Sequence, residues 1–251
     1  MSSPLGVLII HGFTGSRATM EAIIPCVEAL GLPWRLPRLR GHWTKSEDLI
    51  GVTYDDLLAD ANEALTELRG EAERVVIVGL SVGGVLALNL AAERPADIES
   101  LAVLVPALRY VSKLAPFSAI VARLIKITAA DPANAFTDKS LTARSGNYTM
   151  FPTATFVSVY RAGRRVEALL PRVTAPMLII GARQDKVIQP RVAQIAHDRA
   201  GAAQKELVWF ERSGHEMLLD CEADAVADRV GQFLKQRAEL RLQFDPSRAA
   251  P

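Results

Sequence analysis

Long apolar segments are missing from this chain of 251 residues. Its apolar runs are far shorter than the ~18 residues that a membrane-spanning helix needs, so no stable insertion into a membrane is expected. No basic segment precedes the first apolar run at residues 6–10, which leads straight into a glycine-containing motif. The sequence therefore gives no sign of a signal peptide, and we expect a cytoplasmic protein.

Cysteine and surplus charge are also scarce. The two cysteines, Cys26 and Cys221, lie far apart and belong to no C-x-x-C or Cys/His cluster, so no metal site is predicted. Lys plus Arg number 29 and Asp plus Glu number 28, and this balance gives no support to nucleic-acid binding. Apolar residues make up 49% of the chain, which excludes disorder as the main state.

The sequence does contain a regular alternation of strand-like and helix-like segments. Short apolar runs rich in β-branched residues are typical of strands buried on both faces. They lie at 6–10, 74–78, 101–105, 177–180 and 206–210, and a further short strand is predicted at 33–37. Helical spacing of apolar residues is found at 18–30, 55–68, 82–92 and 222–235. This alternation predicts an α/β fold, with a mostly parallel sheet and helices on both faces.

One stretch interrupts the alternation, because the segment between the strands at 101–105 and 177–180 is far longer than one crossover helix needs. A helical apolar stripe lies within it, formed by Phe117, Ile120, Val121, Leu124 and Ile125. We predict a cap insertion at 107–150, between core segments at 1–106 and 151–240, with a disordered tail at 241–251. The alternative is that the stripe adds ordinary core packing.

The strongest chemical signal is the segment Gly-Leu-Ser-Val-Gly at 79–83, which follows a predicted strand and opens a predicted helix. In this G-x-S-x-G context a strained turn exposes the serine oxygen, and the glycines remove side chains that would collide. Ser81 is therefore the predicted nucleophile. A glycine-rich turn that only packs is the alternative.

A serine hydroxyl needs a base to take its proton. The chain has four histidines. His215 comes just after the strand at 206–210, so it is expected at the same sheet edge as Ser81. His11 follows the first strand, His42 lies in an Arg-Gly-His-Trp loop and His197 lies in a predicted helix. His215 is the best candidate base.

A carboxylate must then hold the imidazole in the correct tautomer. Asp185 follows the strand at 177–180 and is expected at the same edge, whereas Asp220 is expected to begin the last helix. The resulting chain order, Ser81, Asp185, His215, is the order found in α/β-hydrolases. The segment His-Gly-Phe-Thr-Gly at 11–15 is the predicted oxyanion hole, with backbone N–H groups of Phe13 and Val82 as donors.

The motifs HGFTGS, GLSVGG, ARQDKVI and SGHEMLLD, in this order, resemble the bacterial carboxylesterase and monoacylglycerol lipase family of α/β-hydrolases. The resemblance covers most of residues 6–236 and is weakest at 107–150. It implies an α/β-hydrolase fold with a small helical cap, no cofactor, and the same triad and oxyanion donors. The family often has Gly-His-Gly after its second strand, whereas this chain has Trp43 at the third position.

These observations favour hydrolysis of small-molecule carboxylic esters with apolar acyl chains through an acyl-enzyme. Phe13, Phe117 and Leu124 are predicted to bind the substrate, with Phe117 and Leu124 contacting the acyl chain. Thioester hydrolysis and carbon–carbon bond hydrolysis use the same kind of triad and stay open. A slow-turnover ligand sensor on the same fold is the alternative from another class. The sequence does not fix the oligomeric state.

Overall fold

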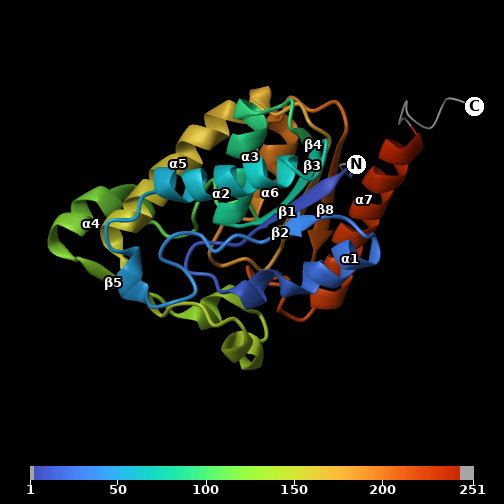
Figure 1. Cartoon of the computed structure of the whole chain (residues 1–251). Coiled ribbons are helices and arrows are strands. Elements are labelled where there is room, and N and C mark those ends of the chain that lie inside the picture. The colour runs from blue at the N-terminus through green and yellow to red at the C-terminus, as the bar shows by residue number, and fades with distance from the viewer. Residues whose placement is uncertain (1–2, 244–251) are drawn as a thin grey trace, which may run out of the picture.

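The computed structural model describes residues 3–243, and its centre is a six-stranded sheet in the order β2-β1-β3-β4-β7-β8 (Figure 1). Every neighbouring pair in this sheet is parallel. The strands are β1 (Gly6–Ile10), β2 (Trp34–Arg35), β3 (Val75–Leu80), β4 (Ile98–Leu104), β7 (Met177–Ala182) and β8 (Lys205–Phe210). The predicted parallel α/β architecture is confirmed.

Continuous apolar runs form these strands because both faces of the sheet are buried. In β1, Leu8 and Ile10 belong to one core cluster, while Val7 and Ile9 belong to the cluster on the opposite face. Strand β3 divides in the same way. Neither of these two central strands has polar alternation, since all their residues are buried.

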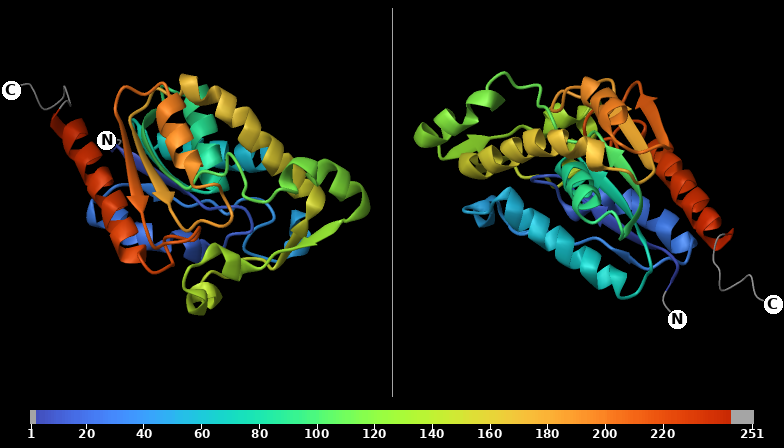
Figure 2. Two further views of the ribbon diagram at one scale, coloured as in Figure 1. Left: turned by 180° about the vertical axis from the view of Figure 1, so that it is seen from behind. Right: turned by 90° about the horizontal axis from the view of Figure 1, so that it is seen from above.

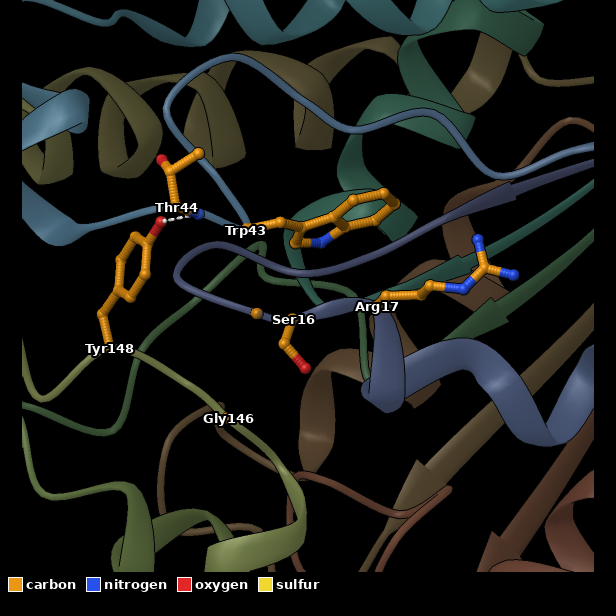
Figure 3. A pocket seen from close by; sticks show the side chains of 7 residues that line it. Ser16, Arg17, Trp43, Thr44, Gly146 and Tyr148 are labelled. Carbon is orange, nitrogen blue, oxygen red and sulfur yellow. Dashed lines mark hydrogen bonds between the residues drawn. The ribbon is translucent and has the colours of Figure 1, made fainter.

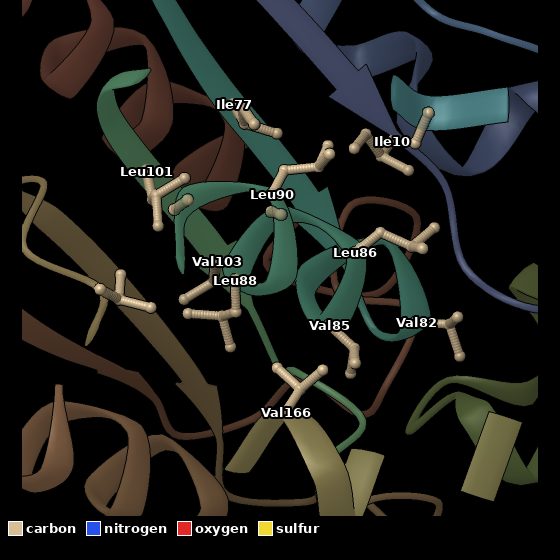
Figure 4. Packing of buried hydrophobic residues seen from close by; sticks show 14 of the residues in the cluster. Ile10, Ile77, Val82, Val85, Leu86, Leu88, Leu90, Leu101, Val103 and Val166 are labelled. Carbon is tan, nitrogen blue, oxygen red and sulfur yellow. The ribbon is translucent and has the colours of Figure 1, made fainter. Parts of the chain in front are cut away.

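Helices cover the two faces unequally (Figures 1 and 2). One face carries α2 (Tyr54–Arg69), α3 (Val82–Glu93), α5 (Thr153–Leu169) and α6 (Arg191–Arg199). The other carries α1 (Ile24–Ala29), a preceding 3-10 helix (Arg17–Ile23) and α7 (Ala223–Gln243). Helix α3 is buried along nearly its whole length, and Figure 4 shows its valines and leucines packed against the sheet and against Val166 of α5. This central position fixes the N-terminus of α3, and with it Ser81.

The largest differences from the sequence predictions lie toward the two ends of the chain. The single helix predicted at 18–30 is instead a 3-10 helix followed by the short helix α1, which has Pro25 in its first turn. Helix α7 continues through Gln243, so the predicted disordered tail at 241–251 begins too early; residues 244–251 lie outside the described residues.

The long segment after β4 contains α4 (Ser118–Leu124), β5 (Ile127–Ala129), several short 3-10 helices and β6 (Met150–Pro152). Strands β5 and β6 pair as an antiparallel ribbon that lies apart from the main sheet (Figure 1). The first residues of the predicted insertion, Ala107 and Leu108, are buried in the core cluster beneath α3.

Within residues 3–243, no helix combines the length and the apolar character that crossing a membrane requires.

Candidate active site

Ser81 occupies a strained turn between β3 and α3. Its backbone has φ 56° and ψ −114°, a conformation that non-glycine residues rarely adopt. Strain of this kind is typical of functional sites, where the surrounding structure maintains it. Hydrogen bonds from Ser81 N–H to the Leu104 carbonyl (2.9 Å) and from Ala107 N–H to the Ser81 carbonyl (3.0 Å) hold the turn in place.

The flanking glycines are required by close backbone contacts. A Cβ atom on Gly79 would lie 2.4 Å from the carbonyl oxygen of Gly83. A Cβ atom on Gly83 would lie 2.1 Å from the carbonyl oxygen of Ile10. Any side chain at either position would therefore push β3, α3 and β1 apart. This is the steric reason for the predicted G-x-S-x-G pattern.

His215 and Asp185 meet at the carboxyl edge of the sheet, on the loops after β8 and β7. His215 Nδ1 lies 2.7 Å from Asp185 Oδ2, and both side chains are almost fully buried. The other carboxylate oxygen, Oδ1, accepts the N–H groups of Val187 and Ile188 at 2.8 Å each. Asp185 is thus fixed by its own loop, and it leaves Nε2 as the free nitrogen of the imidazole.

The carboxylate also sets the basicity of the imidazole. Burial alone lowers the pKa of His215, but the charge of Asp185 and its hydrogen bond more than offset burial. The pKa of His215 is therefore raised above its ordinary value of about 6.5.

Asp220, the other carboxylate near His215 in sequence, has different partners. Its oxygens accept backbone N–H groups of Thr137 (2.8 Å), Asp138 (3.1 Å), Gly214 (2.7 Å) and Cys221 (2.9 Å). Burial opposes ionisation, but these bonds prevail and lower the pKa of Asp220. Asp220 therefore holds the His215 loop against the insertion.

The segment after β1 lies directly beside the nucleophile turn. A Cβ atom on Gly12 would be 3.2 Å from the Cβ atom of Ser81. Among the described residues, the backbone N–H groups of Phe13 and Val82 donate to no protein acceptor. Two donors without a protein acceptor thus lie on the two segments that adjoin Ser81.

Two buried histidines, His11 and His42, fix the shape of this segment. His42 Nε2 accepts the Thr14 N–H (3.1 Å), while its Nδ1 donates to the Arg40 carbonyl (3.0 Å). His11 donates from Nδ1 to the Gly12 carbonyl (2.8 Å), and its pKa is lowered to about 3, mainly by burial. Both imidazoles are therefore neutral hydrogen-bonding supports for residues 12–14.

Trp43, which departs from the family's Gly-His-Gly pattern, has φ 60°. This conformation favours glycine, which accounts for the glycine often found there. The indole ring packs on His11 with ring centroids 5.2 Å apart. It also lines a side cavity of about 420 Å³ with Ser16, Arg17 and Tyr148, next to the loop after β1 (Figure 3).

A larger cavity of about 530 Å³ opens onto Ser81 and His215. Its wall is largely apolar and comes from the loops after β1 and β7, the insertion, β6 and α5: Phe13, Tyr110, Leu114, Val121, Phe151, Phe156 and Val187. The polar exceptions near the base include Asn147 and Glu216. Within residues 3–243, no group of three or more His, Cys, Asp or Glu side chains is arranged to hold a metal ion.

Phe117 and Leu124 are not brought to this cavity, contrary to their predicted contact with an acyl chain. They are 58% and 84% exposed, and the residues near them that line the cavity are Ser118 and Val121 of α4. Of the five residues of the predicted stripe, Val121 alone lines the cavity, and the other four are at least half exposed: Phe117, Ile120, Leu124 and Ile125. The alternative reading, in which the stripe is ordinary core, is contradicted by the same exposure.

The fold and the site together define an α/β-hydrolase, with a serine on a strained strand-to-helix turn and a His–Asp pair at the same sheet edge. Residues 5–222 match the serine aminopeptidase S33 family, and the chain belongs to this family.

Named relatives span nearly the whole chain. A thermostable monoacylglycerol lipase from Bacillus sp. (strain H-257) is 28% identical over 243 residues, covering 94% of this chain and 93% of the relative. A carboxylesterase from Bacillus subtilis (strain 168) is 25% identical, covering 92% of each chain. A structure from work on the metagenome-derived lipolytic enzymes LipS and LipT superposes with a TM-score of 0.87 at 28% identity, covering 94% of this chain and 95% of the other. The predicted family resemblance and the α/β-hydrolase fold are confirmed.

Proposed function

We propose that the protein hydrolyses carboxylic esters with apolar acyl chains, using Ser81 as nucleophile, His215 as base and Asp185 as the carboxylate that orients it. The observation that carries this proposal is the 2.7 Å His215–Asp185 contact at a cavity that also opens onto the strained Ser81 turn. A buried carboxylate on Nδ1 holds the tautomer whose Nε2 can accept the serine proton.

In the proposed reaction, Ser81 Oγ attacks the ester carbonyl while His215 Nε2 takes its proton. The N–H groups of Phe13 and Val82 donate to the carbonyl oxygen as it becomes negatively charged. His215 then protonates the oxygen of the leaving alcohol, and an acyl-enzyme forms. In the second half, His215 takes a proton from water, the resulting hydroxide attacks the acyl carbon, and Ser81 regains its proton as the acid is released.

The acyl chain would occupy the apolar part of the cavity. Burial of each CH₂ group stabilises a bound chain by ~0.8 kcal/mol, so the aromatic and aliphatic wall favours longer acyl groups over acetate. We assign this contact to Val121, Phe151 and Phe156, in place of the exposed Phe117 and Leu124. We retain 107–150 as the cap in this proposal.

The experiment is a panel of p-nitrophenyl esters from acetate to decanoate, assayed with the wild-type chain and with Ser81→Ala. We expect sustained multiple turnovers by the wild type, with kcat/KM rising from acetate to medium-chain esters. Ser81→Ala should retain its melting temperature and lose turnover, by roughly 10⁶-fold as for other serine triads. A single turnover followed by arrest would favour a ligand sensor. Faster cleavage of a matched thioester would favour a thioesterase.

A further inference from the structure

One side chain of the insertion connects the loop of the base with the loop of the candidate oxyanion donor. Asn147 Nδ2 donates to Oε1 of Glu216, the residue after His215, at 2.6 Å. Asn147 Oδ1 accepts the N–H of Ser16, on the loop after β1, at 3.3 Å. Both ends of one amide are therefore engaged, and each end holds a different loop of the candidate active site.

At its Ser16 end, the amide reaches the turn that carries the candidate oxyanion donor. A hydrogen bond from the Gly15 N–H to the Gly12 carbonyl (3.2 Å) closes this turn around Phe13. Ser16 follows the turn directly, and its hydroxyl donates to the Ser145 carbonyl in the same segment as Asn147. The position of the Phe13 N–H therefore depends on how Ser16 is docked against this segment.

At its Glu216 end, the amide reaches the base. Glu216 is 7% exposed, and its backbone N–H donates to the Ala135 carbonyl at 2.9 Å. Among the described residues, Oε2 of Glu216 has no hydrogen-bond partner, so Asn147 supplies the only donor to this carboxyl. A buried carboxyl that lost its only donor would be strongly destabilised, and the loop that carries His215 would shift to give it another partner.

We propose that Asn147 and Glu216 are a positioning pair, which holds His215 and the backbone donor of Phe13 at the separation that the transition state requires. Neither member of the pair touches the reacting atoms. The base and the oxyanion donor act on the same tetrahedral centre, and a displacement of about 1 Å can lower a rate by roughly 100-fold. Loss of the pair should therefore lower kcat and leave substrate binding nearly unchanged. This inference rests on the ester hydrolysis proposed above.

The hydrogen bond of Glu216 can be separated from its charge. Among the described residues, the charged groups that act on Glu216 are His215 and Asp185, since Asn147 is neutral. Burial lowers the pKa of His215, whereas Asp185 and, to a smaller extent, Glu216 raise it. Glu216→Gln keeps an acceptor for Asn147 and removes the charge. Its kcat should stay within about fivefold of the wild type, because a neutral acceptor forms a weaker hydrogen bond. The midpoint of its pH profile should move lower, because the imidazole loses a nearby negative charge.

The test is a double-mutant cycle on kcat and KM with p-nitrophenyl octanoate. Asn147→Ala and Glu216→Met each remove the connecting hydrogen bond, and each should lower kcat roughly 10- to 100-fold with KM changed less than about threefold. The double variant should lose no more than either single variant, because both remove the same contact. Glu216→Gln should recover most of the kcat that Glu216→Met loses.

Glu211→Met is the matched control, since Glu211 also follows β8 but is 71% exposed at its side chain. It should keep the wild-type kcat and pH profile. Melting temperatures identify any variant that fails to fold, and the other truncated variant is then compared with Glu216→Gln. Wild-type kcat in folded Glu216→Met, losses that multiply in the double variant, or a loss confined to KM would overturn the inference while ester hydrolysis stands. A wild type that fails to cleave p-nitrophenyl esters would overturn the proposed function, and the inference with it.

Discussion

The two halves of the segment after β4 are attached to the rest of the molecule in different ways. The outer half, residues 111–130, contains α4 and β5 and is hydrogen-bonded mainly near its ends. Val111 N–H donates to the Val187 carbonyl, and the Lys126 carbonyl accepts the Thr153 N–H, both at 2.9 Å. Most of its large apolar side chains are exposed, including Leu114 at 69% and Ile120 at 60%.

The inner half, residues 131–149, is bonded to the loops that carry the candidate catalytic groups. Asp220 and Glu216 on the His215 loop bind Thr137, Asp138, Ala135 and Asn147. On the other side, Tyr148 N–H donates to the Thr14 carbonyl at 3.1 Å. The inner half therefore bridges the loop of the base and the loop of the oxyanion donors.

The two halves of the insertion therefore do not form one uniform lid. The inner half shares hydrogen bonds with the site, so damage there should lower the rate for every substrate. The outer half contributes Ser118 and Val121 to the cavity wall, so changes there should alter only the preference for acyl length.

The largest effect is expected from substitution of Asp185, which belongs to neither half. Its loss of activity is the reference for the substitutions in the two halves. Asp185→Asn should lower kcat by about 10⁴-fold with an unchanged melting temperature, because the imidazole loses its tautomer.

In the wild type, activity requires neutral His215. Because the pKa of His215 is raised, activity should increase with pH through a midpoint above about 6.5 and fall as pH drops below it. A midpoint well below 6.5, or a silent Asp185→Asn, would contradict this assignment.

An intermediate effect is expected from the inner half. Asp220→Ala leaves four backbone N–H groups without their acceptor, each a loss of about 1–3 kcal/mol when buried. Solvent reaches some of these groups, so we expect a melting temperature lower by about 5–10 °C. Activity should fall to a similar extent at every acyl length. Asp228→Ala on the exposed face of α7 is the control and should change neither quantity. Strong loss of activity at full stability would instead make Asp220 a direct participant.

The smallest effect is expected from the outer half. Val121→Ser should lower kcat/KM for octanoate esters severalfold more than for acetate esters, because the lost apolar contact lies in the cavity wall. Leu124→Ser, at a position of the same helix that is 84% exposed and outside the cavity wall, should leave the whole chain-length series unchanged. The two variants are matched in substitution and differ in whether the side chain lines the cavity. Equal chain-length dependence in both would remove the distinction between these two positions.

The sheet and the residues near Ser81 could be predicted from the sequence, because the patterns that indicate them are local. Buried strands need apolar runs, and the elbow needs glycines at 79 and 83 for steric reasons that any single sequence displays. The edge positions of Asp185 and His215 then followed from parallel strand geometry.

Other features depend on contacts between distant segments. The β5–β6 ribbon pairs Ile127 with Pro152 across a long intervening loop, and no local pattern fixes that register. The bonds of His42 to Thr14 and of Asn147 to Glu216 join residues far apart in the chain. Helical spacing grouped Phe117 and Leu124 with Val121, but only tertiary packing decides that Val121 lines the cavity while the other two are exposed. The match of Gly41-His42 to the first two positions of the family's Gly-His-Gly pattern is the sequence signal that points toward His42.

The central claim is that Ser81 is the nucleophile of an ester hydrolase, and the most direct measurement is the site of covalent labelling by a serine-directed phosphonate. Mass spectrometry of the labelled, digested wild-type chain should find one adduct per chain, on the peptide that contains Ser81. The label should abolish turnover of p-nitrophenyl octanoate, and folded Ser81→Ala should take up none. An adduct on another residue, or wild-type labelling of Ser81→Ala, would contradict the account.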